Sequence, residues 1–147
     1  MNGYMRSMGE AINALMKKTN LTSKDFAKVV FYCLDGRTST ALAKSLGFDP
    51  KNQLQNPLFG ALGNTGTSSP LLLLVVALEE AVPGDNILLA SYGSGSDALI
   101  LKVNDHIDQI KDRLRVKIQL RSKQMVPDYF TYLKWRGLVV GKDTRLP

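Results

Sequence analysis

The sequence predicts an α/β fold in which a mixed β-sheet is packed with helices, one of them apolar and buried. Two observations predict it. Three short apolar runs have the length and composition of strands, namely Lys28–Tyr32, Asn86–Ser91 and Asp97–Val103. Helical patterns lie between the first two runs, and a chain of 147 residues with 44% hydrophobic content can bury one core. The sequence therefore predicts a single α/β unit.

The first third of the chain alternates helix and strand. Apolar residues recur at helical spacing over Met5–Lys18, which predicts an amphipathic helix that ends in the Thr-Asn loop after it. Consecutive apolar residues in Lys28–Tyr32 predict a strand buried on both faces, and an Asp-Gly pair breaks it. The sequence then predicts a helix over Arg37–Leu46 that Gly47 closes in the C′ position.

The middle of the chain is expected to supply the apolar helix. Pro57–Leu62 has the composition of a short helical turn. Ser69 and Pro70 are predicted as the N-cap and first residue of a helix over Leu71–Ala81. Because this helix is apolar almost all round, we expect it in the middle of a protein. The two remaining strands follow it and are joined by a hairpin around Gly93.

The last third of the chain carries the whole net charge of +6, because residues 102–147 hold 11 basic and 5 acidic side chains. We expect residues 105–147 to form a basic extension that packs on the same domain or on a partner. A helix through Asp108 and Asp112, a basic extended stretch and an aromatic turn at Tyr129–Gly137 are predicted there. The charge fits phosphates, an acidic partner or a solvated basic face. No nucleic-acid partner is expected, because aromatics do not interleave the cations before Tyr129.

Several classes of protein are excluded by composition. The longest apolar run, Leu71–Leu78, is too short to span a bilayer, and the N-terminus lacks the features of a signal peptide, so we expect a cytoplasmic protein with no membrane partner. Cys33 is the only cysteine, which excludes an internal disulfide and a cysteine-based zinc site. With His106 as the only histidine, neither a metal site nor a cofactor is expected.

Two loops of small residues are the candidate functional features. Gly63–Ser69 and Ala90–Asp97 each follow an apolar segment, where backbone amides can meet an anion or a developing oxyanion. Gly93–Ala98 also fits the G-x-G-x-x-A form of a dinucleotide-binding fingerprint. That motif needs a helix after it, whereas Ala98–Val103 has the pattern of a strand. A β-turn without a ligand is the remaining alternative.

Four stretches, in family order, resemble the C-terminal half of hydroxymethylglutaryl-CoA synthase-like proteins. They are Asp25–Phe31, Ala43–Asp49, Gly63–Ser69 and Pro83–Ser96. This family belongs to the thiolase superfamily, beside β-ketoacyl-carrier-protein synthase III, and the resemblance covers roughly residues 4 to 140. It implies that residues 1–104 are a partial thiolase-like half, in which three of about five expected strands are found.

The resemblance implies a Claisen-type condensation with acyl-CoA as the substrate. Its implied catalytic residues are Asn64 facing the acyl group, Ser94 in the oxyanion loop, and Tyr32 at the position of the family's histidine. The implied substrate-binding residues are all in the two small-residue loops: Gly63, Thr65, Gly93 and Gly95. A tyrosine with a pKa near 10 is a poor general base at neutral pH, although it can donate a hydrogen bond.

The family's nucleophilic cysteine lies in an N-terminal half that this sequence does not contain. We expect Cys33 to be an inert, buried thiol and His106 to face solvent. The chain is therefore interpreted as a fragment, a split subunit or a truncated relative, and we expect it to self-associate. Two hypotheses stay open. It is either part of an acyl-CoA condensing enzyme or a non-catalytic acyl-CoA-binding or scaffolding module.

The expected partners follow from this incompleteness. The first is a cysteine-bearing thiolase-like half, with a second copy of the chain in a homo-oligomer as the alternative. The closing Tyr132–Gly137 is similar to the tail of archaeal and bacterial members that associate with a zinc-ribbon and OB-fold acyl-CoA-binding protein. The resemblance therefore implies such a protein as a further partner.

Overall fold

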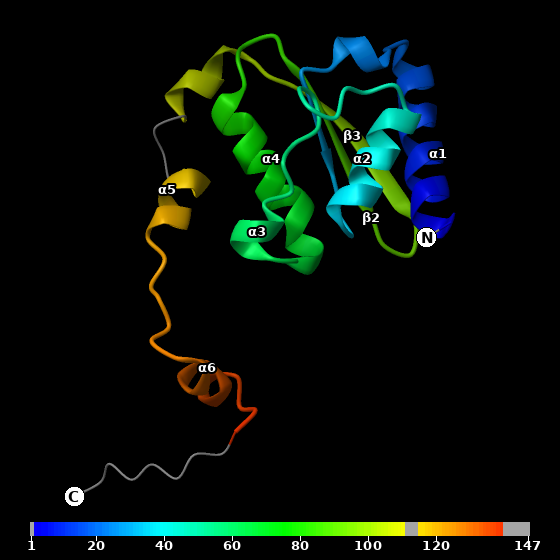
Figure 1. Cartoon of the computed structure of the whole chain (residues 1–147). Helices are drawn as coiled ribbons and strands as arrows, with labels where there is room; N and C mark the ends of the chain where they lie inside the picture. Colours follow the sequence, from blue (N-terminus) through cyan, green and yellow to red (C-terminus); the bar gives the residue numbers. More distant parts are fainter. Residues whose placement is uncertain (1, 111–114, 140–147) are drawn as a thin grey trace, which may run out of the picture.

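The computed structural model describes residues 2–110 and 115–139, which form a three-layer body and a C-terminal extension (Figure 1). Its sheet has the order β1-β2-β3, with strands at Lys28–Phe31, Asn86–Tyr92 and Ser96–Lys102. Strand β1 pairs with β2 in parallel, and β2 pairs with β3 antiparallel. The predicted mixed sheet of the α/β class is confirmed, and the strand bounds differ from the prediction by one residue or less.

Helices cover both faces of the sheet. Helices α1 (Asn2–Thr19) and α2 (Gly36–Ser45) pack on one face, and helix α4 (Ser69–Glu80) packs on the other (Figure 1). Alternation along β1 explains the two layers, because Val29 and Phe31 lie in the cluster with α1 and α2, whereas Val30 lies in the cluster with α4. The prediction of a strand buried on both faces is confirmed.

Helix α2 ends as its sequence predicts. Gly47, at φ +79°, donates its amide to the carbonyl of Lys44, and the amide of Phe48 bonds back to the carbonyl of Ala43. These two bonds form a Schellman motif, for which glycine is favoured because it adopts a positive φ without a steric cost.

Helix α4 begins earlier than predicted and is only partly covered. The 3₁₀ turn η2 (Gly66–Ser68) runs directly into it, so the backbone of Ser68 is already helical and Ser69 is not the N-cap. Leu73, Val76 and Ala77 are buried against the sheet. On the opposite flank Leu71 is 61% exposed. The apolar helix is therefore buried along one side only within the part of the chain that the structure describes.

The described part of the extension contains three short helical segments. They are η3 (Asp105–Gln109), α5 (Val116–Arg121) and α6 (Tyr129–Trp135). Segment η3 is a 3₁₀ helix, and the remainder of the helix predicted there reaches Lys111 and Asp112, which lie outside the described residues. Helix α5 replaces part of the predicted extended stretch. It packs against α4, where its first amide donates to the carboxylate of Glu79.

The chain after α5 also contacts the body. The ammonium of Lys123 donates to the carbonyl of Ala61 in the short helix α3 (Phe59–Leu62). The boundary expected between residues 104 and 105 stays a prediction. None of the described helices has the length and apolar character needed to cross a membrane.

Candidate functional site

The segments that carry the predicted site residues gather at one end of the sheet. Because β1 and β2 are parallel, the loops that follow them leave from the same end of the sheet. There the amide of Tyr32 donates to the carbonyl of Ala90 at 2.8 Å. Helix α4 leads into β2 from the opposite edge, so the start of α4 lies at the end where the strands finish (Figure 1). Three loops and the N-termini of two helices therefore share one end of the molecule.

Asn64 lies in the loop between α3 and α4, and its side chain is exposed. Its Oδ1 accepts the amide of Gly66 at 2.8 Å, which closes a local turn. Gly63 ends α3 at φ +69° with its amide on the carbonyl of Phe59, and the carbonyl of Thr65 accepts the hydroxyl of Ser68. These bonds order the loop. Whether Asn64 faces an acyl group stays a prediction.

The second predicted loop is the hairpin turn between β2 and β3. Gly93, Ser94 and Gly95 are all exposed. The amide of Gly93 donates to the carbonyl of Gly95 at 2.8 Å, so this donor is already used inside the turn. An oxyanion held by this loop would therefore be bound by the amides of Ser94 and Gly95 rather than by that of Gly93, while the part these residues play stays a prediction.

Tyr32 and Cys33 follow β1 directly. Tyr32 is half-buried, and its carbonyl accepts the hydroxyl of Tyr4 at 2.7 Å. Cys33 is buried, as predicted, and its Sγ accepts the hydroxyl of Ser39 at 2.7 Å. Burial raises the pKa of the Cys33 thiol. Because the thiolate is the nucleophilic form, this thiol is poorly suited to attack an acyl group.

His106 lies elsewhere, in η3 after β3, and is exposed as predicted. Its Nδ1 pairs with the side-chain amide of Gln109 at 3.3 Å. Within residues 2–110 and 115–139, no group of three or more His, Cys, Asp or Glu side chains is placed to hold a metal ion.

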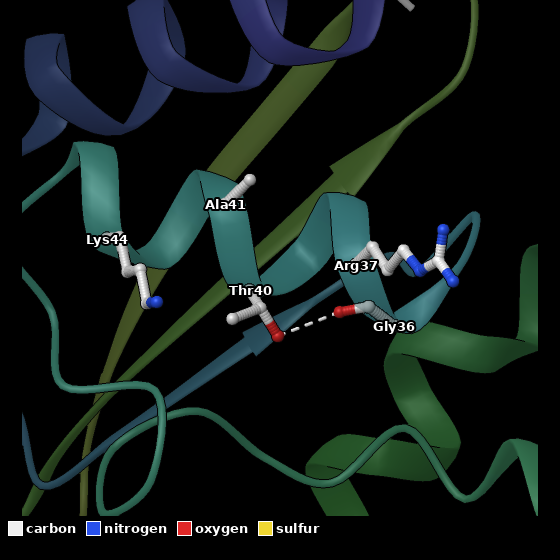
Figure 2. Close-up of a pocket in the computed structure, with 5 residues that line it drawn as sticks. All are labelled: Gly36, Arg37, Thr40, Ala41 and Lys44. Carbon is white, nitrogen blue, oxygen red and sulfur yellow. Dashed lines mark hydrogen bonds between the residues drawn. The ribbon is translucent and has the colours of Figure 1, made fainter.

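A shallow, open groove along α2, whose described lining residues all belong to that helix, was not predicted from the sequence. It has a volume of about 380 Å³. Figure 2 shows its lining on one side of the helix, with Arg37 and Lys44 at the two ends and Thr40 between them. The signal was available, because residues spaced by three, four and seven positions share one face of a helix. Two cations on that face make the groove basic.

Asp35 fixes the start of α2 beside this groove. Its carboxylate accepts the amide of Thr38 at 2.8 Å and the hydroxyl of the same residue at 2.7 Å. The amide of Thr38, then its hydroxyl, and the nearby Arg37 hold the pKa of the Asp35 carboxyl below its usual range. The carboxylate is therefore ionised at neutral pH and offsets part of the positive charge at the Arg37 end, leaving Lys44 as the less compensated cation.

Curated relatives match nearly the whole chain. It is 34% identical over 138 residues to the hydroxymethylglutaryl-CoA synthase of Methanosphaera stadtmanae, a match that covers 92% of this chain and 40% of that protein. It is 37% identical over 142 residues to the enzyme of the same name from Aeropyrum pernix, which covers 95% of this chain and 39% of that protein. The chain therefore spans about two fifths of the length of these relatives.

Solved structures and a family profile agree with these matches. The 3-oxoacyl-[acyl-carrier-protein] synthase III of Pseudomonas aeruginosa PAO1 aligns with a TM-score of 0.62 at 19% identity, over 69% of this chain and 33% of that chain. The enzyme of the same name from Aquifex aeolicus VF5 aligns with a TM-score of 0.59 at 26% identity, over 67% of this chain and 32% of that chain. The profile described as 3-oxoacyl-[acyl-carrier-protein (ACP)] synthase III C terminal matches residues 16–103. The three findings together show that this chain is similar to the C-terminal part of thiolase-like proteins, and it belongs to the 3-oxoacyl-[acyl-carrier-protein] synthase III C-terminal family.

Proposed function

We propose that this chain binds an acyl-CoA thioester at the end of the sheet where β1 and β2 finish, as one part of a Claisen-type condensing site. The observation that carries the proposal is the gathering, in a chain of this family, of three loops and two helix N-termini at that end. Backbone amides at such a place stabilise negative charge that develops on a thioester oxygen.

The α2 groove is where the phosphates of CoA would bind. Arg37 and Lys44 are seven residues apart, and a rise of about 1.5 Å per residue separates their backbones by about 10 Å along the helix. CoA carries phosphates at separate points of its nucleotide, so both cations can contact one ligand. Helix α2 begins directly after the loop from Tyr32 to Asp35. A ligand whose phosphates bind the groove could therefore place its thioester end at the loops.

In this proposal the loop residues act on the acyl group. Asn64 would exchange its bond with Gly66 for one to the substrate, and the amides of Ser94 and Gly95 would donate to the thioester oxygen. Donors of this kind typically contribute about 3 kcal/mol to lowering the barrier. Tyr32 would donate a hydrogen bond from its hydroxyl.

The nucleophilic cysteine would come from a partner half, because Cys33 is buried and its pKa is raised. Among the described residues, an exposed apolar surface is available for that partner. It consists of the outer flank of α4, the face of β3 around Leu99, which is 58% exposed, and a groove of about 250 Å³ between Leu78 and Leu101. Apolar surfaces of this kind mark interaction sites. A non-catalytic acyl-CoA-binding or scaffolding role, the alternative, needs the same groove but no such partner.

A second surface fits the expected zinc-ribbon and OB-fold partner. Helix α6 has no buried residue, and its aromatic side chains are exposed. Trp135 is 72% exposed, and Arg136 lies next to it. Tryptophan, tyrosine and arginine are the residue types that dominate binding energy at protein interfaces, which supports α6 as a contact for a protein partner.

A carrier-protein thioester is the second candidate substrate, and the exposure of the groove favours considering it. An acidic protein surface can contact both cations of α2 as well as a nucleotide can. The two candidates differ in what must be present. A CoA thioester should bind tightly only with its phosphates, whereas a carrier protein should bind without any nucleotide.

Equilibrium titration of the full chain with acetyl-CoA tests the proposal. We expect the variant Arg37→Ala/Lys44→Ala to bind about tenfold more weakly or worse, because a hydrogen bond to a charged group is typically worth about 1.5–3 kcal/mol. The control is Lys17→Ala/Lys18→Ala at the far end of α1, which removes the same charge and should bind as the wild type does. Equal losses in the two variants, or no binding by the wild type, would contradict the proposal. Intact-mass analysis of the same samples should show no acetyl group on Cys33.

A further inference from the structure

The first turn of α1 lies against both of the loops that follow the parallel strands. Tyr4 is 2% exposed, and its hydroxyl donates to the carbonyl of Tyr32 at 2.7 Å. The amide of Tyr32 is held in turn by the carbonyl of Ala90. The backbone of Tyr32 is therefore bonded on one side to the start of α1 and on the other side to β2.

The ring of Tyr4 makes a second contact, with the other loop. Its centroid lies 5.3 Å from that of Tyr92, edge to face at an interplanar angle of 74°. Tyr92 is the last residue of β2 and comes directly before the Gly93–Gly95 turn. A Cβ on Gly3 would lie 3.3 Å from the Tyr92 hydroxyl, so the turn of helix that carries Tyr4 also approaches this residue closely. The Tyr4 side chain thus contacts the first residue of the Tyr32–Asp35 loop and the residue before the Gly93–Gly95 turn.

The surroundings of Tyr4 keep its hydroxyl a donor. Burial raises the pKa of Tyr4, and Cys33 beside it raises that pKa further. The hydroxyl of Ser39, whose Oγ lies 2.7 Å from Cys33 Sγ and 3.0 Å from the carbonyl oxygen of Asp35, can donate to either and belongs to the same polar cluster. Because the cluster lies beneath the loop from Tyr32 to Asp35, the hydrogen bonds of Tyr4 and Ser39 fix the backbone from which both the loop and the α2 groove begin.

We infer that Tyr4 is a positioning residue that holds the Tyr32 loop and the Gly93–Gly95 hairpin in a fixed arrangement. The inference rests on the proposed function in one respect only: the arrangement allows a thioester to contact both loops at once. Without the hydroxyl bond, the carbonyl of Tyr32 loses its partner and the loop can shift relative to the hairpin. Neither loop needs to lose its own internal bonds for this to happen.

Hydrogen exchange of the full chain without any ligand tests the inference first. Tyr4→Phe keeps the ring and its contact with Tyr92 but removes the hydroxyl. We expect amides of the Tyr32–Asp35 loop to exchange about tenfold faster, while those of α4, and those of the hairpin that the ring still contacts, stay unchanged. The control is Tyr92→Phe, whose hydroxyl makes no hydrogen bond among the residues that the structure describes. Unchanged exchange in the Tyr32–Asp35 loop, or a rise that is equal in α4, would overturn the inference, because the second result marks a general loss of stability.

The affinity for acetyl-CoA provides the second measurement, at a temperature where all variants are folded. We expect Tyr4→Phe to bind about three- to tenfold more weakly and Tyr92→Phe to bind as the wild type does. Wild-type affinity in Tyr4→Phe would overturn the positioning role. If the wild type does not bind acetyl-CoA, the proposed function fails, and hydrogen exchange alone then decides the role of Tyr4.

Discussion

Helices α2 and α6 have the same kind of N-cap, but α2 is packed in the core and α6 is exposed. Each has an aspartate N-cap, Asp35 or Asp128, whose carboxylate accepts both the amide and the hydroxyl of a threonine three residues later. Helix α2 then buries Leu42 and Ala43 in the core, whereas α6 has no buried residue. The comparison shows that a cap fixes where a helix begins, while packing decides how much the helix contributes to the fold.

The exposed helix is instead ordered by contacts within itself. The rings of Tyr129 and Tyr132 are stacked with centroids 5.8 Å apart, and the ammonium of Lys134 lies 5.0 Å from the centroid of Phe130. Isolated helices of seven residues are marginal in water, so such contacts alone hold α6 weakly. A surface of this kind gains stability when a partner covers it, which agrees with the partner proposed for α6.

Truncating one apolar side chain in each helix should show the difference between α2 and α6 most clearly. Leu42 is fully buried, so Leu42→Ala should lower the free energy of unfolding by about 2–5 kcal/mol. Trp135→Ala, at a residue 72% exposed, should change it by less than about 0.5 kcal/mol. Urea denaturation followed by far-ultraviolet circular dichroism measures both. A large loss in Trp135→Ala would mean that α6 packs on the body.

Removing each cap should give the next largest effect. We expect Asp35→Ala to lower the folding equilibrium constant about fivefold, because the start of α2 is coupled to the core, and typical caps have effects of this size. Asp128→Ala should reduce only the helicity of residues 129–135, with no change in the unfolding midpoint. Thermal unfolding and amide chemical shifts distinguish the two results. Equal shifts of the midpoint would contradict the assigned difference.

The smallest expected effect is a dependence on pH. The pKa of Asp35 is lowered in the folded chain, first by the amide of Thr38, so its ionised form stabilises the fold above the unfolded pKa of about 3.9. That stability is lost as the pH falls through the lowered pKa. Asp35→Asn keeps an acceptor without the titration, so its stability between pH 5 and about pH 2 should fall less than that of the wild type. Parallel curves would show that this carboxylate makes no contribution.

The sequence predicted the parts of the fold whose signals are local. The strand of Val29 to Phe31, the glycine that closes α2 and the burial of Cys33 follow from apolar runs, a left-handed glycine and the usual place of a lone thiol. Helix α5 was not predicted, because its contact with Glu79 is made across 37 residues. The start of α4 was misplaced because a 3₁₀ turn continues into the helix.

The candidate site was predicted less completely, for a related reason. Loop composition indicated two segments, and the fold brings them to one end of the sheet, while their role stays a prediction. It did not show that the amide of Gly93 is used inside its own turn or that Asn64 bonds to Gly66. The α2 groove was not predicted because two cations seven residues apart are also the ordinary pattern of a solvated helix face.

The most direct test of the central claim is an amide chemical-shift titration of the full ¹⁵N-labelled chain with acetyl-CoA. If acetyl-CoA binds as proposed, shifts are expected in α2 around Arg37 and Lys44, in the Tyr32 loop and in the hairpin at Ser94, with α6 unchanged. The same titration with S-acetylpantetheine, which lacks the nucleotide, should leave α2 unshifted. Shifts confined to α6, or no shift at the end of the sheet where β1 and β2 finish, would contradict acyl-CoA binding at that end.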